Sequence, residues 1–476
     1  MSYLELLFVE AMVILGFLCA LALVPRIIME RRQAGAAVAW LMAVCLFPYL
    51  GVPLYLIFGG RRVERVRARK QGPHLETDNE AASAGDIVDE SAWDVASLML
   101  RSGATPPLRD NGVTVIGDGE RAYDEILEAI NNAERRIEVC TYILGRDRVG
   151  TTIVSRLARK ARQGVEVKLL IDSLGSIWTR RHALRKLRAA GGEVGWFLPM
   201  VHFRRRAAAH LRNHRKLIVI DDRVAFVGGM NLSAEYMGPP TARTRWRDVL
   251  VRLEGPAVAE LHHVFNADWT FTTDAEPRKT HVDSSWSLEN AGHGDSIVQV
   301  TPDGPDIRQN PIGSGITAAV ARARERVWIV TPYFVPDESF SNMLELAARL
   351  GRDVRIIIPR RTKIRTADLA CRSYLDSLIE AGASVFVYDR SFLHAKLLVV
   401  DDMMAGVGSF NVDVRSFHLN FEIGAFLYDE KSVRKIAETV ADIQADATPL
   451  DTEEFARRSG SRRFLEDTCR LLSPLL

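Results

Sequence analysis

The same order of predicted elements occurs twice in this chain, and this duplication limits the possible folds more than any other feature. Helical patterns alternate with apolar strands over residues 122–197 and again over residues 316–387. Strands that alternate with helices favour crossover connections and a largely parallel sheet. Near-continuous apolar strands indicate sheets that are covered on both faces. We therefore predict an α/β fold of two repeats, each a mostly parallel β-sheet flanked by helices, related by pseudo-twofold symmetry.

Each copy continues into an H-x-K-x4-D string, in which a histidine, a lysine and an aspartate keep the same spacing. The six residues are His214, Lys216, Asp221, His394, Lys396 and Asp401. The residues that follow each histidine are apolar and partly β-branched, which predicts a strand. Because side chains alternate faces along a strand, the histidine and the lysine of each string should point the same way. We predict that these six residues are catalytic.

A second predicted strand follows each string and leads to a turn that contains glycine and asparagine. The turn residues of interest are Gly228, Asn231, Gly408, Ser409 and Asn411. Glycine permits close approach of the backbone to a ligand, and an amide can stabilise phosphoryl oxygens. We therefore predict that these five positions bind substrate. The copies differ at one place, because Gly229 stands where the second copy has Ser409.

Two histidines, two lysines and two asparagines at one site suit a reaction at a phosphodiester. One histidine can attack phosphorus while the other protonates the leaving alcohol. The lysines and amides can stabilise the negative charge that develops. This set requires no metal and no cofactor. A zinc site that combines His210 with His214 is the competing interpretation, but no H-E-x-x-H pattern surrounds them.

Two acidic residues, Asp248 and Glu422, each follow a motif asparagine by about the length of one strand. A carboxylate in either place can bond the second ring nitrogen of a histidine and fix its tautomer. Ordinary salt bridges are the alternative, with Arg247 as a candidate partner for Asp248. The residues alone leave both interpretations open.

Two long apolar runs lie in the first sixty residues. From Leu6 to Pro25 the only charge is Glu10, and residues 34–60 carry no charge. Each run is long enough to cross a hydrocarbon core of roughly 30 Å as a helix, so we predict a transmembrane helical hairpin. A cleaved signal peptide is disfavoured because no basic residue precedes the first run. The basic residues at 61–70 place the following domain on the cytoplasmic side, although the loop between the runs is also basic.

The composition agrees with a folded protein of two or three domains, since 47% of the 476 residues are hydrophobic and 26% are charged. Five scattered cysteines without a C-x-x-C pair argue against a disulfide framework or a zinc–thiolate site. We predict four segments: the hairpin with its basic flank (1–70), a polar linker (71–91), the first repeat (92–290) and the second repeat (291–476). A basic and apolar loop near residues 200–206 either rests on an anionic membrane surface or is solvated.

The duplicated string resembles the signature of the phospholipase D superfamily. The apolar hairpin with residues 46–51, the segment 331–337 and the segment 411–422 resemble bacterial cardiolipin synthases more closely. This resemblance covers nearly the whole chain. It implies transfer of a phosphatidyl group between two phosphatidylglycerol molecules, which gives cardiolipin and glycerol through a phosphatidyl-histidine.

The resemblance also implies roles for particular residues. His214 is then the nucleophile and His394 the acid and base, and Asp248 and Glu422 orient the two histidines. It further implies a multi-pass protein of the bacterial cytoplasmic (inner) membrane that binds phosphatidylglycerol and cardiolipin and no nucleic acid. A phospholipase D-type hydrolase, or a phosphatidyltransferase with another acceptor, would use the same residues. A nuclease fits the membrane hairpin poorly, and a non-enzymatic scaffold would not need both histidines. The oligomeric state is not indicated.

Overall fold

A computed structural model describes residues 3–29, 34–58, 70, 88–179, 181–199, 211–241, 245–273, 294–307, 309–471 and 473. The chain divides into two compact units, Met1–Val66 and Arg67–Leu476. Both predicted repeats therefore belong to one compact unit. Most of the predicted linker, most of the basic flank, the loop at 200–206 and His210 lie outside the described residues.

The first unit consists of helices α1 (Tyr3–Met29), α2 (Ala34–Leu46) and α3 (Pro48–Phe58). The second apolar run thus forms two helices rather than the one long helix that we expected. The break falls at Phe47, because Pro48 starts a new helix in the position where its missing N–H costs nothing. Trp40 and Tyr55 pack edge to face across α2 and α3, with ring centres 5.5 Å apart. Within the described part of the chain, we find no helix whose length and apolar character would allow it to cross a membrane.

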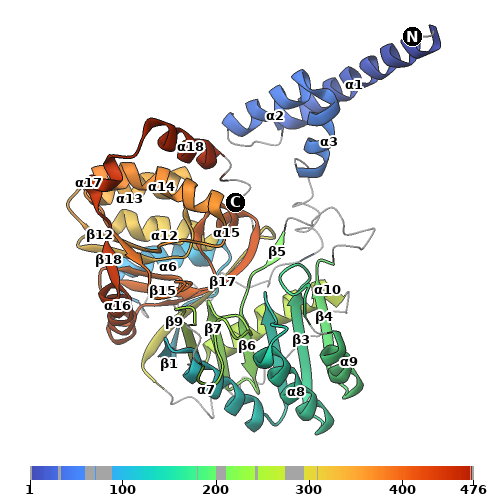
Figure 1. The fold of residues 1–476 in the computed structure, drawn as a ribbon. Coiled ribbons are helices and arrows are strands. Elements are labelled where there is room, and N and C mark those ends of the chain that lie inside the picture. The colour runs from blue at the N-terminus through green and yellow to red at the C-terminus, as the bar shows by residue number, and fades with distance from the viewer. Residues whose placement is uncertain are drawn as a thin grey trace. The chain divides into compact units, whose positions relative to one another are not determined.

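Helices and strands alternate in the second unit as the sequence predicted (Figure 1). The first repeat contains β1 (Leu108–Ile116), α7 (Gly119–Asn132), β2 (Arg136–Thr141), α8 (Arg148–Arg162), β3 (Glu166–Asp172), α9 (Arg181–Ala189), β4 (Glu193–Phe197), β5 (Arg212–Asn213), β6 (Leu217–Ile220), β7 (Val224–Gly228), β8 (Leu250–Glu254) and α10 (Ala257–Thr273). Aspartates begin several of these helices, as where the Asp118 side chain accepts bonds from two backbone N–H groups of α7.

The second repeat has the corresponding elements and a short C-terminal extension. It contains β9 (Ser296–Asp303), α12 (Pro311–Arg322), β10 (Arg326–Val330), β11 (Phe334–Val335), α13 (Glu338–Arg349), β12 (Asp353–Pro359), α14 (Arg365–Glu380), β13 (Ser384–Tyr388), β14 (Leu397–Val400), β15 (Met404–Gly408), β16 (Val412–Asp413), α15 (Val414–His418), β17 (Asn420–Leu427), α16 (Glu430–Ala445), β18 (Ala447–Pro449), α17 (Thr452–Ala456) and α18 (Gly460–Leu471).

Most strands form one continuous sheet in the order β18-β13-β12-β10-β14-β15-β17-β9-β1-β8-β7-β6-β2-β3-β4. The short strand β5 pairs with β17 beside this path, and β11 and β16 form a separate parallel pair. Strands β9 and β1 pair with each other where the two repeats meet. From this pair to either edge of the sheet, the strands of the two repeats follow in the same order. The prediction of a mostly parallel sheet is wrong. The outer strands β2, β3 and β4 are parallel, but β6, which lies within the first motif, is antiparallel to both of its neighbours. The second repeat has the same arrangement, so the sheet is mixed.

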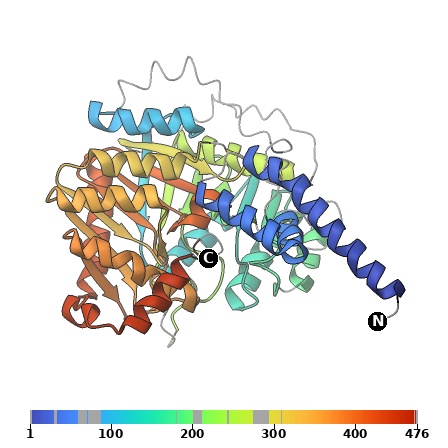
Figure 2. The ribbon, with the colours of Figure 1, turned by 90° about the horizontal axis from the view of Figure 1, so that it is seen from above.

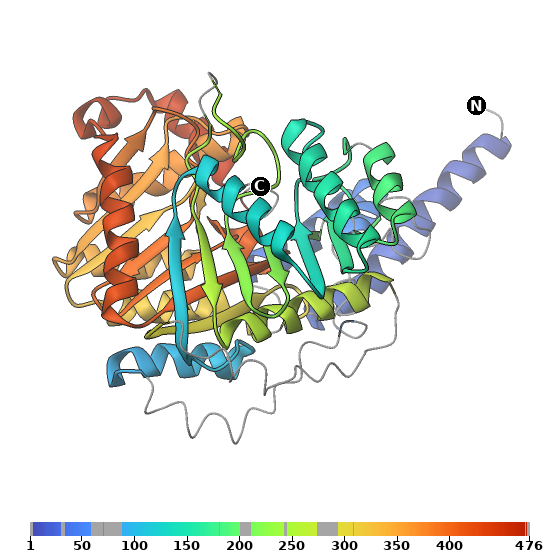
Figure 3. The same ribbon diagram turned by 90° about the horizontal axis from the view of Figure 1, so that it is seen from below.

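Helices cover the sheet on both faces and enclose two apolar cores, one in each repeat. Figure 3 shows α8 and α10 on opposite sides of the strands of the first repeat. One helix lies outside the division that we predicted from the sequence. Helix α6 (Glu90–Ser102) packs beside α12 (Figure 2), and its buried Val95 and Met99 belong to the core of the second repeat.

Candidate active site

The two motif histidines are each anchored by backbone bonds to the opposite repeat. His214 lies between β5 and β6, and its N–H donates to the carbonyl oxygen of Phe421 at 2.9 Å. His394 precedes β14, and its N–H donates to the carbonyl oxygen of Arg247 at 2.7 Å. Strand β6 begins at Leu217 rather than at His214, since the preceding residues turn toward the other repeat. The structure therefore brings both motifs to the junction of the repeats.

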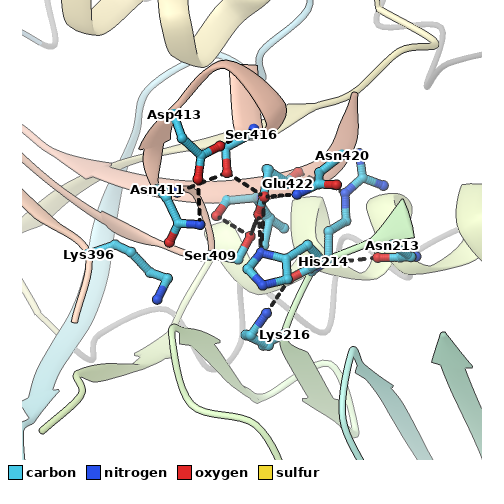
Figure 4. Close-up of polar contacts among 12 residues, drawn as sticks. Asn213, His214, Lys216, Lys396, Ser409, Asn411, Asp413, Ser416, Asn420 and Glu422 are labelled. Atoms are coloured by element: carbon cyan, nitrogen blue, oxygen red, sulfur yellow. Dashed lines mark hydrogen bonds and ion pairs between the residues drawn. The ribbon is translucent and has the colours of Figure 1, made fainter. Parts of the chain in front are cut away.

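Both acidic residues lie against a histidine ring, again from the opposite repeat. Nδ1 of His214 is 3.0 Å from each carboxylate oxygen of Glu422, which lies on β17 (Figure 4). Nδ1 of His394 is 2.7 Å from Oδ2 of Asp248. Each imidazole thus directs Nδ1 to a carboxylate and leaves Nε2 for chemistry. The sequence suggested both acids but gave no indication of which histidine each would meet.

The two carboxylates differ in the number of groups that donate to them. Glu422 accepts bonds from Ser409, Ser416 at 3.0 Å and Asn420 at 3.2 Å as well as from His214 (Figure 4). Among the described residues, Asp248 accepts from His394 and from one backbone N–H, that of Val249. Ser416 and Asn420 are site residues that sequence reasoning missed, although both lie in the segment 411–422 that carried the resemblance.

These surroundings shift the pKa values of the two carboxylic acids in opposite directions. Burial would raise the pKa of Glu422, but His214 and Lys216 outweigh it and hold this pKa below its usual value. Burial raises the pKa of Asp248 to about 7, against the opposing effect of Lys396. At neutral pH Glu422 is therefore ionised, whereas Asp248 is protonated in about half of the molecules.

Burial also lowers the pKa values of the motif histidines and lysines. It lowers the pKa of His214 to about 4 in spite of Glu422, with Lys216 adding to the effect. The pKa of His394 lies well below its ordinary value because of burial and then because of Lys396 and Lys216. The pKa of Lys216 falls to about 7 and that of Lys396 to about 8, again mainly through burial. His214 is thus a neutral imidazole, as a nucleophile must be.

The lysines and asparagines of the motifs lie beside the histidines. Nζ of Lys216 donates to the carbonyl oxygen of His214 at 2.6 Å, and Nζ of Lys396 is 2.9 Å from Nδ1 of His394. The side-chain amide of Asn411 donates to Asp413 at 2.9 Å, and its buried carbonyl oxygen has no hydrogen-bond partner among the described residues (Figure 4). Asn231 accepts a bond from the backbone of Ile143 at 3.0 Å.

The turn glycines allow close approach of neighbouring strands rather than of a ligand. A Cβ atom on Gly228 would lie 2.5 Å from the carbonyl oxygen of Val249, and one on Gly408 would lie 2.3 Å from that of Ile423. The Ser409 hydroxyl donates to Glu422 and so supports the histidine pair instead of facing substrate. These contacts give the three positions a structural role, and substrate contact at them stays a prediction.

The motif aspartates lie at the far end of the motif strands. Seven residues at roughly 3.3 Å each allow a separation of up to about 23 Å between Asp221 and His214. The Asp221 carboxylate accepts three backbone N–H bonds, from Glu134, Arg135 and Arg136, at 2.7 to 2.8 Å. Asp401 accepts the corresponding three bonds in the second repeat. Both carboxylates thus fix the turn that starts the adjacent strand, and a direct catalytic role for them stays a prediction.

A buried charged network supports the segment around His214. The Asp268 carboxylate accepts a hydrogen bond from the Asn213 side-chain amide at 2.9 Å and one from the Arg215 guanidinium at 2.6 Å. It therefore holds the residues on both sides of His214. Nζ of Lys70 completes this network at 2.5 Å from Asp268 and 2.9 Å from Asp306. Sequence reasoning missed Lys70, which looked like the end of a basic flank.

Aromatic rings line the two histidines. Tyr142 lies edge-on to His214 with ring centres 5.0 Å apart, and Tyr236 lies edge-on to His394 at the same distance. Trp246 approaches His394 at 5.5 Å. These rings exclude water from the imidazoles, which accounts for the burial that lowers both histidine pKa values.

Comparisons with known proteins identify relatives over nearly the whole chain. A family model described as "Cardiolipin synthase, PLD-like domain" matches residues 126–269 and 316–443. A second model, "Phospholipase_D-nuclease N-terminal", matches residues 18–60. A cardiolipin synthase of Staphylococcus aureus (strain Mu50) is 35% identical over 94% of this chain and 93% of its own length. Cardiolipin synthase 1 of Bacillus anthracis is 33% identical over 94% of this chain and 91% of its own length.

Among solved structures, the phosphatidylserine synthase of Haemophilus influenzae Rd KW20 superposes with a TM-score of 0.58 and 16% identity. The match covers 76% of this chain and 95% of that one, and it supports the fold. The two PLD-like matches span both motifs, and the curated relatives extend over nearly the whole chain. The chain therefore belongs to the cardiolipin synthase family, the phosphatidyltransferases of the phospholipase D superfamily.

Proposed function

We propose that this chain transfers a phosphatidyl group from one phosphatidylglycerol to the terminal hydroxyl of another, forming cardiolipin and releasing glycerol. The observation that carries this proposal is the crossed pairing of His214 with Glu422 and of His394 with Asp248. The names of the curated relatives supply the substrate class. The motif residues are proposed to act as follows.

In the first half-reaction, Nε2 of His214 attacks the phosphorus of the donor, and the bond from phosphorus to the glycerol oxygen breaks. The glycerol oxygen takes a proton from Nε2 of His394 as it leaves. The phosphate of the donor favours protonation of His394 when it binds, and Asp248 stabilises the imidazolium. Lys216, Lys396 and the motif asparagines stabilise the negative charge on the phosphoryl oxygens.

In the second half-reaction, His394 takes the proton of the acceptor hydroxyl as its oxygen attacks phosphorus. The bond from phosphorus to His214 breaks, and the free imidazole is restored. The phosphatidyl-imidazole at His214 carries a positive charge, which the ionised Glu422 opposite Nδ1 stabilises. Asp248, with its raised pKa, suits a partner that gains and loses a proton. These differences support His214 as nucleophile and His394 as acid and base.

We also propose the finer points of architecture and location. The corresponding strand orders support a pseudo-twofold relation of the repeats, with a division near residue 290 and α6 assigned to the second repeat. The apolar side chains exposed on α1 to α3, such as Phe17, Leu21 and Leu46, support a multi-pass anchor in the bacterial cytoplasmic membrane. The repeats then lie on the cytoplasmic side. Extraction of cell membranes with alkaline carbonate tests the anchor, because release of the protein would refute it.

A leaving-group experiment tests the assignment of the two histidines. Full-length protein is mixed with phosphatidylglycerol vesicles, and cardiolipin and glycerol are measured. His214→Ala and His394→Ala should each lower turnover by at least a hundredfold, since general acid–base catalysis alone contributes about 10²- to 10⁴-fold. With a phosphatidyl ester of p-nitrophenol, whose leaving group needs no proton, His394→Ala should still release one equivalent of nitrophenol rapidly. A rapid release by His214→Ala instead would reverse the assignment.

A further inference from the structure

The second repeat contains a cavity of about 380 Å³ that does not include either motif histidine. Its apolar wall includes Ile358, Leu375 and Phe455, and its polar groups include Tyr333 and Arg372. The lining also includes two further arginines, Arg360 and Arg458, and three carboxylates, those of Asp368, Asp451 and Glu454. A cavity of this size falls in the range of small-ligand sites. The lining therefore suits the polar head of an amphiphile rather than a wholly apolar molecule.

The cavity lies along the same edge of the sheet as His394. Val330, the last residue of β10, pairs with Leu397 of the motif strand β14 and with Ile357 of β12. The cavity is lined by the residues that follow β10 and by the ends of β12 and β13. Neighbouring strands are about 4.8 Å apart, so these strand ends lie roughly 5 to 15 Å from the strand of His394.

Tyr333 links the cavity to the active site. Its hydroxyl pKa is raised to about 12 by burial and then by the charges of Asp413 and Asp368. Asp413 bonds the motif amide of Asn411, whereas Asp368 lines the cavity. Tyr333 lines the cavity, and its neighbour Phe334 pairs with Val412, the residue that follows Asn411. Tyr333 therefore lies beside the motif segment of the second repeat.

One cation of the cavity is not neutralised. Arg360 pairs with Asp389 at 2.7 Å, and Arg458 pairs with Asp376 and Glu466. The guanidinium of Arg372 lies 5.9 Å from the centre of the Phe455 ring, and within the described part of the chain no carboxylate pairs with it. The carboxylates of Asp368, Asp451 and Glu454 also line the cavity. Because none of them forms an ion pair with Arg372 among the described residues, this guanidinium is the group suited to bind a phosphate of a ligand.

The proposed reaction requires such a second phosphate site. A phosphatidylglycerol has one phosphate, and that of the donor lies at the histidines. The acceptor brings another, separated from its attacking hydroxyl by the three carbons of glycerol, or roughly 6 Å when extended. The ends of β10 and β12, which border the cavity, lie one and two strand spacings from the strand of His394, so this part of the cavity is in the correct range.

We propose that this cavity binds the glycerophosphate head of the acceptor phosphatidylglycerol, with Arg372 on its phosphate and Tyr333 at the passage to the active site. This inference rests on the proposed function, because it assigns the place of the second substrate. The acceptor hydroxyl then points past Tyr333 toward the phosphatidyl-histidine. No bond forms or breaks in the cavity itself.

The experiment compares acceptors with and without a phosphate. Full-length protein in phosphatidylglycerol vesicles yields cardiolipin from the lipid acceptor, phosphatidic acid from water, and phosphatidylethanol when ethanol is added. Arg372→Gln should lower cardiolipin formation about tenfold or more, while phosphatidylethanol and phosphatidic acid stay within about twofold of the wild type. Arg372→Lys, which keeps the charge, should retain part of the cardiolipin activity. Arg365→Gln, exposed at the start of the same helix α14, is the matched control and should leave all three products unchanged.

The outcomes separate this inference from the proposed function. Unchanged cardiolipin formation in Arg372→Gln would overturn the acceptor site. A parallel loss of all three products would also overturn it, since Arg372 would then support only the fold. If thermal unfolding shows that Arg372→Gln is not folded, the ratio of cardiolipin to phosphatidylethanol is measured in Tyr333→Phe and Arg372→Lys instead. A wild-type protein that makes phosphatidylethanol but no cardiolipin would refute the proposed function itself.

Discussion

Replacement of Lys216 by methionine should stabilise the ligand-free protein while it abolishes activity. Lys216 is buried beside a second lysine, Lys396, and burial lowers its pKa from 10.5 to about 7. This lowering means that the folded protein holds the charged ammonium unfavourably until a phosphate binds. Methionine has a similar length and no charge, so it removes the unfavourable charge and keeps most of the packing.

The magnitude follows from the pKa. A fall from 10.5 to about 7 corresponds to about 5 kcal/mol at 1.36 kcal/mol per pH unit. Methionine also loses the bond from Nζ to the carbonyl oxygen of His214, 2.6 Å long, which offsets about 1 to 2 kcal/mol. The free energy of unfolding should therefore rise by about 3 kcal/mol at pH 7 or below.

The sign of the pH dependence gives a sharper test. Between about pH 7 and 10.5 the unfolded wild-type chain holds a proton on Lys216 that the folded protein has lost. The free energy of unfolding of the wild type therefore rises with pH across this window, by up to about 1.4 kcal/mol per unit from this group. The variant lacks this component, so its advantage should shrink as the pH rises. It should vanish between about pH 9 and 10, where the remaining penalty of the charge equals the about 1 to 2 kcal/mol of the lost bond.

The assay is denaturant unfolding of detergent-solubilised, ligand-free protein at pH 6.5 and pH 10. Lys435→Met is the matched control, since Lys435 is 61% exposed on α16 and its loss should change stability by less than about 0.5 kcal/mol. If Lys216→Met were less stable than the wild type at pH 6.5, or if its advantage were the same at pH 10, the reasoning from burial would be refuted.

Two further substitutions probe the supports of the site. Lys70→Met should destabilise the protein by about 3 kcal/mol, because it leaves buried carboxylates without their cation. Turnover by the folded fraction should also fall as the segment around His214 loosens. Equal stability of variant and wild type in denaturant would contradict this prediction. Asp221→Asn should lower stability by about 1 to 3 kcal/mol through its three backbone bonds, yet kcat per folded molecule should stay within about twofold. A loss of kcat comparable to that of Lys216→Met would restore Asp221 to a direct catalytic role.

The sequence predicted the alternation of elements and the meeting of the two motifs because both depend on local patterns that occur twice. It misjudged the direction of the motif strands. Residues 217–220 are uniformly apolar, and such a run is equally compatible with parallel and antiparallel neighbours. It also misassigned α6, because the apolar stripe of an amphipathic helix does not reveal which of two cores it covers.

The site itself was predictable in its residue types but not in its pairing. Glu422 meets His214 across 208 positions of sequence, and no local spacing encodes a contact between opposite repeats. Asp221 illustrates the reverse limit. Its fixed place in the motif suggested chemistry, whereas the structure shows that the constant spacing reflects the length of a strand and the turn that closes it.

The small difference at Gly229 and Ser409 explains how a duplicated fold can divide two roles between its halves. A Cβ atom on Gly229 would lie 2.1 Å from the carboxylate of Asp248. Even the shorter acid therefore fits in the first repeat because the residue beside it is a glycine. In the second repeat Ser409 donates to the longer acid, Glu422. Each added donor favours the ionised carboxylate, and Glu422 has more of them than Asp248. One histidine therefore faces a fixed negative charge and the other faces an acid that titrates near neutrality, which is the difference that a nucleophile and a proton carrier require.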